Sequence, residues 1–211
     1  MREALPDAPS IEIDAGIDLP AADGLRLSLW RTEDLPAVMA AGADPEIQAF
    51  TSMPGPEEAA AADWLARQER QRRQGRAVHF ALRDESGRPL GNAGFVAFTW
   101  MHRRAEVGYW VLPSYRRQGV GSRGLRLVTD WAFKRLPIER IDLFVNLDNT
   151  ASKRVAEAEG YEYEARLRSF RIEHGERRDL DLYRQLSPGG GGGGGGGGRG
   201  GAGGGGGGRG G

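Results

Sequence analysis

The sequence of 211 residues contains no cysteine. This absence excludes disulfide bonds, thiolate zinc sites and cysteine nucleophiles. Histidine is scarce as well, and His79, His102 and His174 have neither the i, i+4 spacing nor the acidic neighbours of a metal site. We therefore expect no bound metal.

Long hydrophobic runs are also missing. No apolar stretch approaches the roughly 18 residues that a membrane-spanning helix needs. The first residues include Arg2, Glu3 and Asp7 and lack the apolar core of a signal peptide. These absences predict a cytoplasmic protein without a membrane partner.

Net charge is a third feature that the chain lacks, because 29 Lys and Arg residues balance 29 Asp and Glu residues. A protein that binds nucleic acid through phosphate contacts usually carries a positive excess, so composition argues against this partner. One feature that would favour RNA binding is the sequence Arg-Gly-Gly, which occurs at Arg199 and at Arg209. RNA-binding segments of this kind contain more arginines, interleaved with aromatic residues.

Glycine is abundant and marks the domain limits. Residues 188–211 are almost wholly glycine, cannot bury apolar surface and are predicted to be disordered. Residues 1–22 contain acids and prolines without helical or strand periodicity and are predicted to form a flexible arm. A single domain at 23–187 remains, which is long enough for one core.

Hydrophobic periodicity and turn residues predict the order of elements within this domain. We expect strands at 24–30, 77–83, 89–100, 105–112, 138–145, 161–172 and 180–186, helices at 32–41, 57–74, 121–136 and 150–159, and an irregular segment at 41–56. Turns between successive strands predict antiparallel hairpins. The strand, loop, helix and strand across 105–145 instead predict two parallel neighbours. The fold class is therefore α/β with a mixed, mostly antiparallel sheet.

The loop YRRQGVGSRG at 115–124 allows two interpretations. Gly119, Gly121 and Gly124 have the Gly-x-Gly-x-x-Gly spacing of a dinucleotide-binding turn. In such a turn the first glycine follows its strand almost directly and more βα units follow, neither of which holds here. The second interpretation, Arg-x-x-Gly-x-Gly from Arg116, is favoured. It places a basic loop at a helix N-terminus, where backbone N–H groups and the helix dipole suit a diphosphate, and leaves Gly124 to pack closely against the sheet.

Three motifs lie in the same part of the chain: Glu-x-Gly-Tyr-Trp from Glu106, Arg-Arg-Gln-Gly-x-Gly from Arg116, and Asn-x-x-Ser-x-x-x-Ala-x-x-x-Gly-Tyr from Asn149. Together they resemble the core of a GNAT-superfamily N-acetyltransferase of the RimJ/RimL type. The resemblance extends over about 25–186, with Tyr161 where phenylalanine is commoner. It implies the acyl-CoA N-acyltransferase (GNAT) fold, in which the two parallel strands splay apart.

The resemblance also implies acetyl-CoA as co-substrate, without a metal. Its pyrophosphate would sit on the loop backbone, and its pantetheine would pair with the strand before the loop, where an N–H group could polarise the thioester carbonyl. The cofactor-binding residues that it implies are Val111, Leu112, Arg116, Arg117, Gln118, Gly119, Val120, Gly121, Ser122 and Asn149.

Two residues are candidate catalytic groups. Glu106 is the candidate general base, because it lies on the strand bordering the cleft; the alternative is an exposed carboxylate paired with Arg103 or Arg104. The resemblance implies that Ser152 is the general acid that reprotonates the coenzyme A thiolate, and a helix-capping role is the alternative for Ser152 and Asn149. Tyr161 and Tyr163 could replace Ser152, although an aromatic residue at a strand start is more often core.

The expected function is transfer of an acetyl group from acetyl-CoA to a primary amine, by direct attack in a ternary complex. The RimJ/RimL resemblance favours a protein N-terminal α-amine, which is partly neutral near pH 8, whereas a lysine amine titrates near ~10.4. A small-molecule amine such as an antibiotic, a polyamine or an amino acid is the alternative. A non-catalytic CoA-binding protein and an RNA-binding protein are more distant ones. We expect a monomer or a homodimer, with the acceptor surface formed by 42–57 and 100–104.

Overall fold

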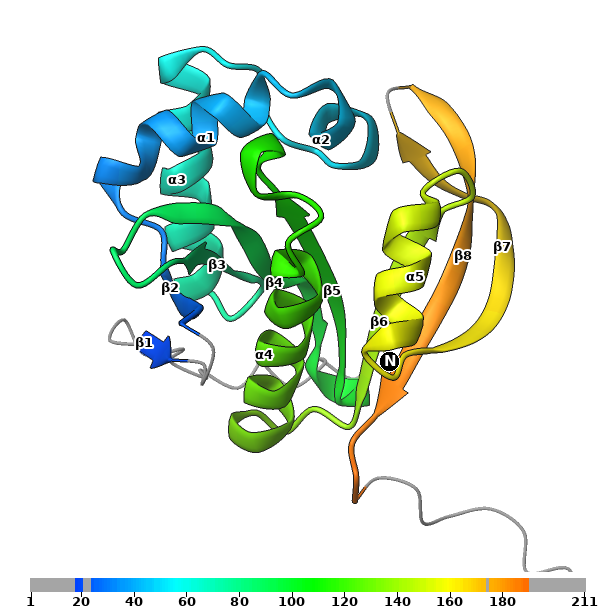
Figure 1. Cartoon of the computed structure of the whole chain (residues 1–211). Coiled ribbons are helices and arrows are strands. Elements are labelled where there is room, and N and C mark those ends of the chain that lie inside the picture. Colours follow the sequence, from blue (N-terminus) through cyan, green and yellow to red (C-terminus); the bar gives the residue numbers. More distant parts are fainter. Residues whose placement is uncertain (1–17, 21–23, 174, 190–211) are drawn as a thin grey trace, which may run out of the picture.

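The computed structural model describes residues 18–20, 24–173 and 175–189, and these residues form one mixed sheet with helices packed against it (Figure 1). The strands are β1 (Asp18–Pro20), β2 (Arg26–Leu29), β3 (Val78–Arg83), β4 (Pro89–Thr99), β5 (Arg104–Val111), β6 (Arg140–Asn146), β7 (Glu162–Glu173) and β8 (Glu176–Leu186). The α-helices are α1 (Leu35–Gly42), α2 (Pro45–Phe50), α3 (Glu58–Arg73), α4 (Val120–Arg135) and α5 (Thr150–Ala158). Short 3-10 helices are η1 (Thr32–Asp34), η2 (Trp100–His102) and η3 (Pro113–Tyr115).

The strands follow the order β1-β2-β3-β4-β5-β6-β8-β7 across the sheet. Neighbouring strands are antiparallel, except for β5 and β6, which are parallel. The helix α4 provides the crossover between these two, as a parallel pair requires. The mixed, mostly antiparallel α/β fold predicted from the sequence is confirmed.

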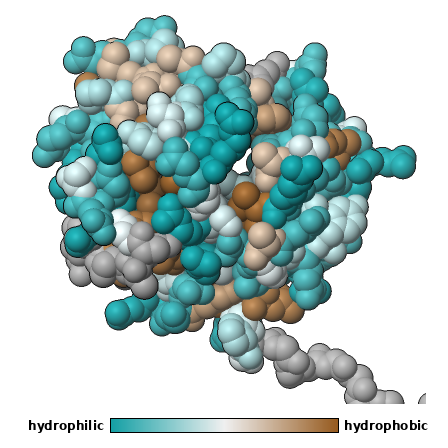
Figure 2. Space-filling model, viewed as in Figure 1, coloured by the Kyte–Doolittle hydropathy of each residue, from teal (hydrophilic) through white to brown (hydrophobic). Residues whose placement is uncertain are grey.

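The parallel pair is hydrogen-bonded over only part of its length. Its register contains Arg104 with Arg140, Ala105 with Ile141 and Glu106 with Asp142, and pairing ends there. Both strands then continue separately, β5 to Val111 and β6 to Asn146, so the predicted splay is present. Figure 2 shows a hollow on this face of the molecule, between the part that carries β5 and α4 and the part that carries α5.

The helix α4 covers one face of the sheet through its apolar side. Leu125, Val128 and Trp131 are buried there among sheet residues such as Phe80 and Phe95. Each such side chain contributes roughly 1.5–3 kcal/mol when it is buried. This burial fixes the position of the helix N-terminus relative to β5, and thus the position of the loop before it.

Gly124 lets α4 approach the sheet closely. A Cβ atom at this position would lie 2.6 Å from Leu82 Cδ1, well inside van der Waals contact. The close packing predicted for Gly124 is confirmed, and it accounts for the third glycine of the apparent dinucleotide motif.

The helices α1 and α3 pack against the opposite face of the sheet around a group of tryptophans. The Trp30 ring stacks on Trp110 at 5.6 Å between centroids and meets Trp64 edge-on at 5.7 Å. Trp110 belongs to β5, where side chains alternate between faces, so Tyr109 and Val111 point to the α4 side. Glu106, Gly108 and Trp110 therefore lie on the face of β5 opposite to α4.

Two short elements, β1 and α2, lie in segments that were predicted to lack regular structure. The strand β1 (Asp18–Pro20) pairs with β2 and lies within the segment predicted to be a flexible arm. It was not predicted because three residues are too few to show a periodicity. The helix α2 lies in the segment predicted to be irregular. It begins with Asp44, whose carboxylate accepts from Ile47 N at 2.8 Å, and has Pro45 in its first turn, both ordinary start signals.

The remainder of the arm (1–17 and 21–23) and the glycine tail from 190 onward lie outside the described residues. Within the part that the structure describes, no helix has both the length and the apolar character to cross a bilayer.

Candidate active site

The loop between η3 and α4 has an unusual backbone. Gly119, the N-cap of α4, has φ of 72°, and Arg117 has φ of 58°. Glycine adopts this left-handed conformation freely, whereas a residue with a side chain pays about 1–2 kcal/mol. Such strain tends to be retained where a loop binds a ligand.

The first turn of α4 can bind an anion. The N–H groups of Val120, Gly121 and Ser122 precede the first main-chain bond of the helix, from Arg123 N to Gly119 O at 3.0 Å, and so have no partner within the helix. Apart from its chain neighbours, a Cβ at Gly119 would come near one described atom, Arg123 Nε at 3.9 Å, so the space beside this N-cap is open. The donors and the positive end of the helix dipole fit a diphosphate.

Arg116 and Arg117 have different roles. The Arg116 guanidinium forms ion pairs with Asp44 and, at 2.8 Å, with Glu46, and its Nε donates to Val111 O at 3.2 Å. These contacts hold the guanidinium against α2 and the end of β5, and the cofactor contact of Arg116 stays a prediction. Arg117 is exposed and makes no ion pair with the described residues, so it remains the candidate phosphate ligand.

The Arg116 contacts attach α2 to the cofactor loop. Burial raises the pKa of Asp44, but hydrogen bonds from Arg116 and from the Ile47 backbone outweigh it, so the net pKa is lowered. Asp44 thus caps α2 and anchors Arg116 with the same carboxylate. The segment predicted to form the acceptor surface is fixed to the segment predicted to bind the cofactor.

The other polar side chains of the loop are used within the protein. Ser122 Oγ donates to the Glu159 carboxylate at the end of α5, and Gln118 Nε2 donates to Ser114 O at 3.0 Å. The Ser122 hydroxyl hydrogen and one Gln118 amide hydrogen are therefore engaged within the protein, and the predicted cofactor contacts of both residues stay predictions.

The end of β5 offers one backbone group to the splay. Leu112 N donates to Leu90 O at 2.9 Å within the sheet, and the cofactor contact of Leu112 stays a prediction. Successive residues of a strand direct their N–H groups to opposite edges, which turns the Val111 N–H toward β6. Val111 stays a candidate for the pantetheine or the thioester carbonyl.

Glu106 lies where the pairing of β5 and β6 ends. Its carboxylate accepts from Arg171 Nη2 of β7 at 2.8 Å, and its side chain is 22% exposed. The alternative partners considered from the sequence are occupied elsewhere, since Arg103 pairs with Glu139 and Arg104 with Asp142. Glu106 is therefore a half-buried, ion-paired carboxylate rather than an exposed one.

A kink in β7 brings Arg171 into reach of Glu106. The register of β7 with β8 shifts between Leu167 and Arg171, and Ser169 has φ of 47° with its N–H bonded to Asp179 at 2.8 Å. After the kink, Phe170 stacks on Phe144 of β6 at 5.0 Å between ring centroids. Arg171 lies over the same Phe144 ring at 5.2 Å. No local sequence signal identifies this arrangement, because it depends on strands far apart in the chain.

Asn149 and Ser152 lie at the start of α5, across the splay from β5. Asn149 Oδ1 accepts from Ser152 N at 3.0 Å and so caps the helix. The contact to the cofactor that the resemblance implies would fall to its amide nitrogen. Tyr109 of β5 donates its hydroxyl to Ser152 Oγ at 3.1 Å, a partner that the sequence analysis missed.

The tyrosines considered as alternative acids lie elsewhere. Tyr161 is 2% exposed and shares a hydrogen bond with Thr129 Oγ1 at 2.5 Å in the core. Tyr163 is 54% exposed on β7 and meets Tyr183 edge-on. The phenol that is hydrogen-bonded to Ser152 is instead that of Tyr109.

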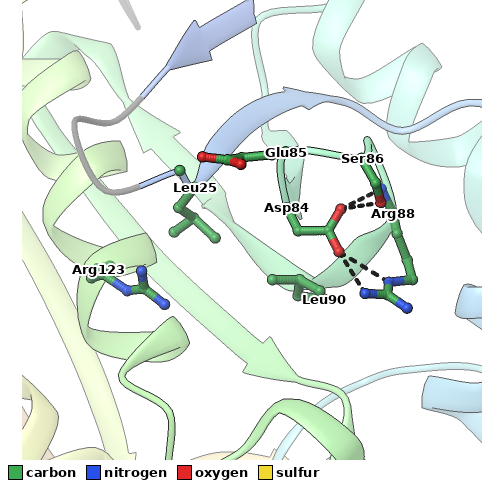
Figure 3. A pocket seen from close by; sticks show the side chains of 8 residues that line it. Leu25, Asp84, Glu85, Ser86, Arg88, Leu90 and Arg123 are labelled. Atoms are coloured by element: carbon green, nitrogen blue, oxygen red, sulfur yellow. Dashed lines mark hydrogen bonds and ion pairs between the residues drawn. The ribbon is translucent and has the colours of Figure 1, made fainter.

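A pocket of about 410 Å³ lies beside the cofactor loop (Figure 3). The turn at 84–88 forms one side and Arg123 of α4 the other, and Asp84 pairs with Arg88 at 2.8 Å within it. The lining residues are Gly24, Leu25, Asp84, Glu85, Ser86, Arg88, Leu90 and Arg123. None of the predicted site residues lines this pocket, so it is separate from the splay.

A sheet whose parallel strands separate beside a glycine-containing loop and a helix N-terminus defines the acyl-CoA N-acyltransferase fold. The chain belongs to the acetyltransferase (GNAT) domain family, whose model matches residues 24–162. Across the described residues, no group of three or more His, Asp or Glu side chains is arranged to hold a metal ion.

A sequence relative is the uncharacterized N-acetyltransferase YoaA of Bacillus subtilis (strain 168), which is 34% identical over 99 residues. This match covers 47% of the present chain and 56% of YoaA, so the chain spans about half the length of that relative.

Solved structures show the same fold. An acetyltransferase from Salmonella typhimurium that modifies the N-terminal serine of ribosomal protein L7/L12 superposes with a TM-score of 0.73 at 19% identity, covering 81% of this chain and 99% of its own. Mycobacterium smegmatis RimJ, in complex with CoA-disulfide, superposes with a TM-score of 0.71 at 23% identity, covering 77% and 82%.

Proposed function

We propose that this protein transfers an acetyl group from acetyl-CoA to a primary amine, most favourably the α-amine of a protein N-terminus, by direct attack in a ternary complex. The observation that carries the proposal is the splay. Pairing of β5 with β6 ends at Glu106, and the opened edge of β5 leads directly to the anion-binding turn of α4. A nucleotide diphosphate and a thioester at the end of a long flexible arm match these two features.

The residues of this chain would bind and orient the co-substrate as follows. The N–H groups of Val120, Gly121 and Ser122, with the exposed Arg117, would hold the diphosphate. The Val111 N–H would donate to the thioester carbonyl and stabilise its developing negative charge. Acetyl-CoA would supply the acetyl group as a thioester.

Glu106 would act on the amine from the face of the sheet opposite to α4. Its carboxylate, held by the hydrogen bond from Arg171, would accept a proton from the amine directly or through a water molecule. An α-amine titrates near ~8, so a substantial fraction is already neutral at physiological pH, whereas a lysine amine near ~10.4 needs stronger assistance. Modest base assistance therefore suffices for an α-amine.

The charges around the splay favour a peptide over a polyamine. Asp44 and Glu46 are both paired with Arg116, and Glu106 is paired with Arg171. A polycationic acceptor would need unpaired carboxylates along its length, whereas the stacked Phe144 and Phe170 offer an apolar wall to a peptide side chain. The Salmonella relative that modifies a ribosomal-protein N-terminus supports this choice.

The test is a panel of amines assayed for CoA release with the full-length protein. The panel contains short peptides with different first residues, the same peptides with a blocked N-terminus and a free lysine, aminoglycosides and polyamines. We expect turnover of free-N-terminal peptides and none of the blocked ones. Preferential turnover of polyamines or aminoglycosides would replace the peptide assignment, and CoA release from no amine would remove the proposed activity.

We also propose that residues 23–187 contain the complete catalytic domain. Deletion of 188–211 should leave the kcat and both KM values within about twofold of those of the full chain, because the described core ends with β8 at Leu186. Loss of turnover on truncation would show that the glycine tail takes part in the reaction.

A further inference from the structure

Tyr109 lies in the part of β5 that no longer pairs with β6. Its ring faces the first turn of α4, where a Cβ at Gly121 would come within 3.0 Å of Tyr109 Cε2. Its hydroxyl reaches across to the first turn of α5 and donates to Ser152 Oγ at 3.1 Å. One side chain thus contacts the anion-binding turn and the candidate acid together.

The hydrogen bonds around Ser152 determine what its hydroxyl can do. A serine hydroxyl has one hydrogen to donate and two lone pairs to accept with. Tyr109 is the donor in its hydrogen bond with Ser152 Oγ, and burial, partly offset by this bond, raises the pKa of the phenol to about 12, so it keeps its proton at physiological pH. Because Ser152 Oγ accepts from Tyr109, its own hydrogen is left to donate to another group.

The backbone of Ser152 is held as well. Its N–H donates to Asn149 Oδ1 at 3.0 Å, which fixes the residue in the first turn of α5. With the backbone and one lone pair engaged, the hydroxyl has few orientations left. The positive end of the α5 dipole lies at the same place and favours negative charge nearby.

We propose that Tyr109 is a positioning residue that acts through Ser152, directing the Ser152 hydroxyl hydrogen into the splay, where it stabilises negative charge on the thioester sulfur. This inference rests on the proposed acetyl transfer. It assigns a role to a second polar residue of the Glu-x-Gly-Tyr-Trp motif, Tyr109, in addition to Glu106. It also explains why a serine, a weak acid by itself, can assist departure of a thiolate.

The variant Tyr109→Phe tests the proposal, because it removes the hydroxyl and keeps the ring that packs on Gly121. We expect kcat to fall about tenfold, the loss that corresponds to about 1.4 kcal/mol of transition-state stabilisation, with the acetyl-CoA KM within about twofold. Ser152→Ala should lose at least as much. The double variant should equal Ser152→Ala, because Tyr109 acts through Ser152.

A second readout needs no acceptor. The thiolate of bound CoA absorbs ultraviolet light, so its pKa in the complex can be titrated directly. We expect this pKa to rise by about one unit in both Tyr109→Phe and Ser152→Ala relative to the unaltered protein, since each loses the donor to sulfur. Tyr163→Phe, which removes an exposed hydroxyl on β7, is the matched control and should change neither kcat nor the thiol pKa.

The outcomes separate the two proposals. An unchanged thiol pKa and kcat in Tyr109→Phe, or losses that multiply in the double variant, would overturn the role of Tyr109 while acetyl transfer stands. A shifted thiol pKa with no turnover of any amine would support Tyr109 and overturn the proposed acceptors. Failure of the unaltered protein to bind CoA would overturn both.

Discussion

Arg171 of β7 donates to the Glu106 carboxylate of β5 at 2.8 Å, although the two residues are 65 positions apart and their strands are not neighbours in the sheet. The kink at Ser169 makes this pair possible, and the Arg171 guanidinium lies over the Phe144 ring at 5.2 Å. The pair lies at the point where β5 and β6 separate, and so holds the Glu106 carboxylate at the start of the splay.

Replacement of Glu106 tests its role as the base. Glu106→Gln should lower kcat by about 100-fold, the usual contribution of a general base, while the acetyl-CoA KM changes by less than about threefold. Steady-state kinetics with the preferred peptide measure both. Glu139→Gln, which alters an exposed carboxylate paired with Arg103, is the matched control. Full activity of Glu106→Gln would remove Glu106 from the mechanism.

Arg116 should influence the acceptor more than the cofactor. Arg116→Gln breaks the contacts with Asp44 and Glu46 that hold α2 against the loop. We expect the acceptor KM to rise about tenfold, equivalent to about 1.4 kcal/mol, with the acetyl-CoA KM within threefold. Asp44→Asn should behave similarly, and Arg73→Gln on the exposed side of α3 should have no effect. A selective rise in the acetyl-CoA KM would instead assign Arg116 to the pyrophosphate.

Arg117 should influence the cofactor instead. Arg117→Glu places a negative charge beside the diphosphate, and we expect the acetyl-CoA KM to rise more than about tenfold. Arg117→Gly removes the charge but relaxes a backbone with φ of 58°, so it should give a smaller rise. Titration of acetyl-CoA at several salt concentrations checks the electrostatic origin, which screening should weaken. Equal acetyl-CoA KM values for the two variants would show that the charge at this position does not act on the diphosphate.

Gly124 should not tolerate a methyl group. In an open helix, glycine to alanine usually stabilises, but Gly124→Ala would bring a Cβ within 2.6 Å of the fully buried Leu82. Overpacking of this kind costs about 1–3 kcal/mol and should lower the melting temperature by several degrees. In Gly124→Ala combined with Leu82→Ala, the loss should be smaller than the sum of the single losses. Additive losses in thermal unfolding would contradict direct contact.

His79 should make stability depend on pH. Burial lowers its pKa from 6.5 to about 4; the Asn92 hydrogen bond opposes this lowering in part, and the charge of the nearby Arg67 adds a smaller lowering. The unfolded chain therefore binds a proton that the folded chain does not, and stability falls as the pH decreases from 6.5 toward 4. Between pH 7 and pH 5 the loss is about 2 kcal/mol.

Urea unfolding at both pH values measures this effect, with His79→Gln as the comparison. The variant should lose clearly less stability than the unaltered protein between pH 7 and pH 5. The same loss in both would assign the pH dependence to other groups.

Most of the fold could be predicted from the sequence, because helix and strand periodicity and turn residues act over a few neighbouring positions. The order of strand, loop, helix and strand at 105–145 predicted the parallel pair, and Gly124 was correctly assigned to packing against the sheet rather than to the loop. The helix α2 was missed although Asp44 and Pro45 are start signals, since its six residues are too few to show a periodic face.

The features of the candidate site also fall into those set by neighbouring residues and those set by tertiary packing. The sequence by itself determined the loop backbone and the helix N-terminus, because glycine conformation and helix capping are local properties. Only the tertiary structure decided that Arg116 binds Asp44, that Arg171 binds Glu106 and that Tyr109 holds Ser152, with partners 72, 65 and 43 positions apart. The partner of a charge or a hydroxyl depends on which side chains meet in space, and that is set by the packing of the whole sheet.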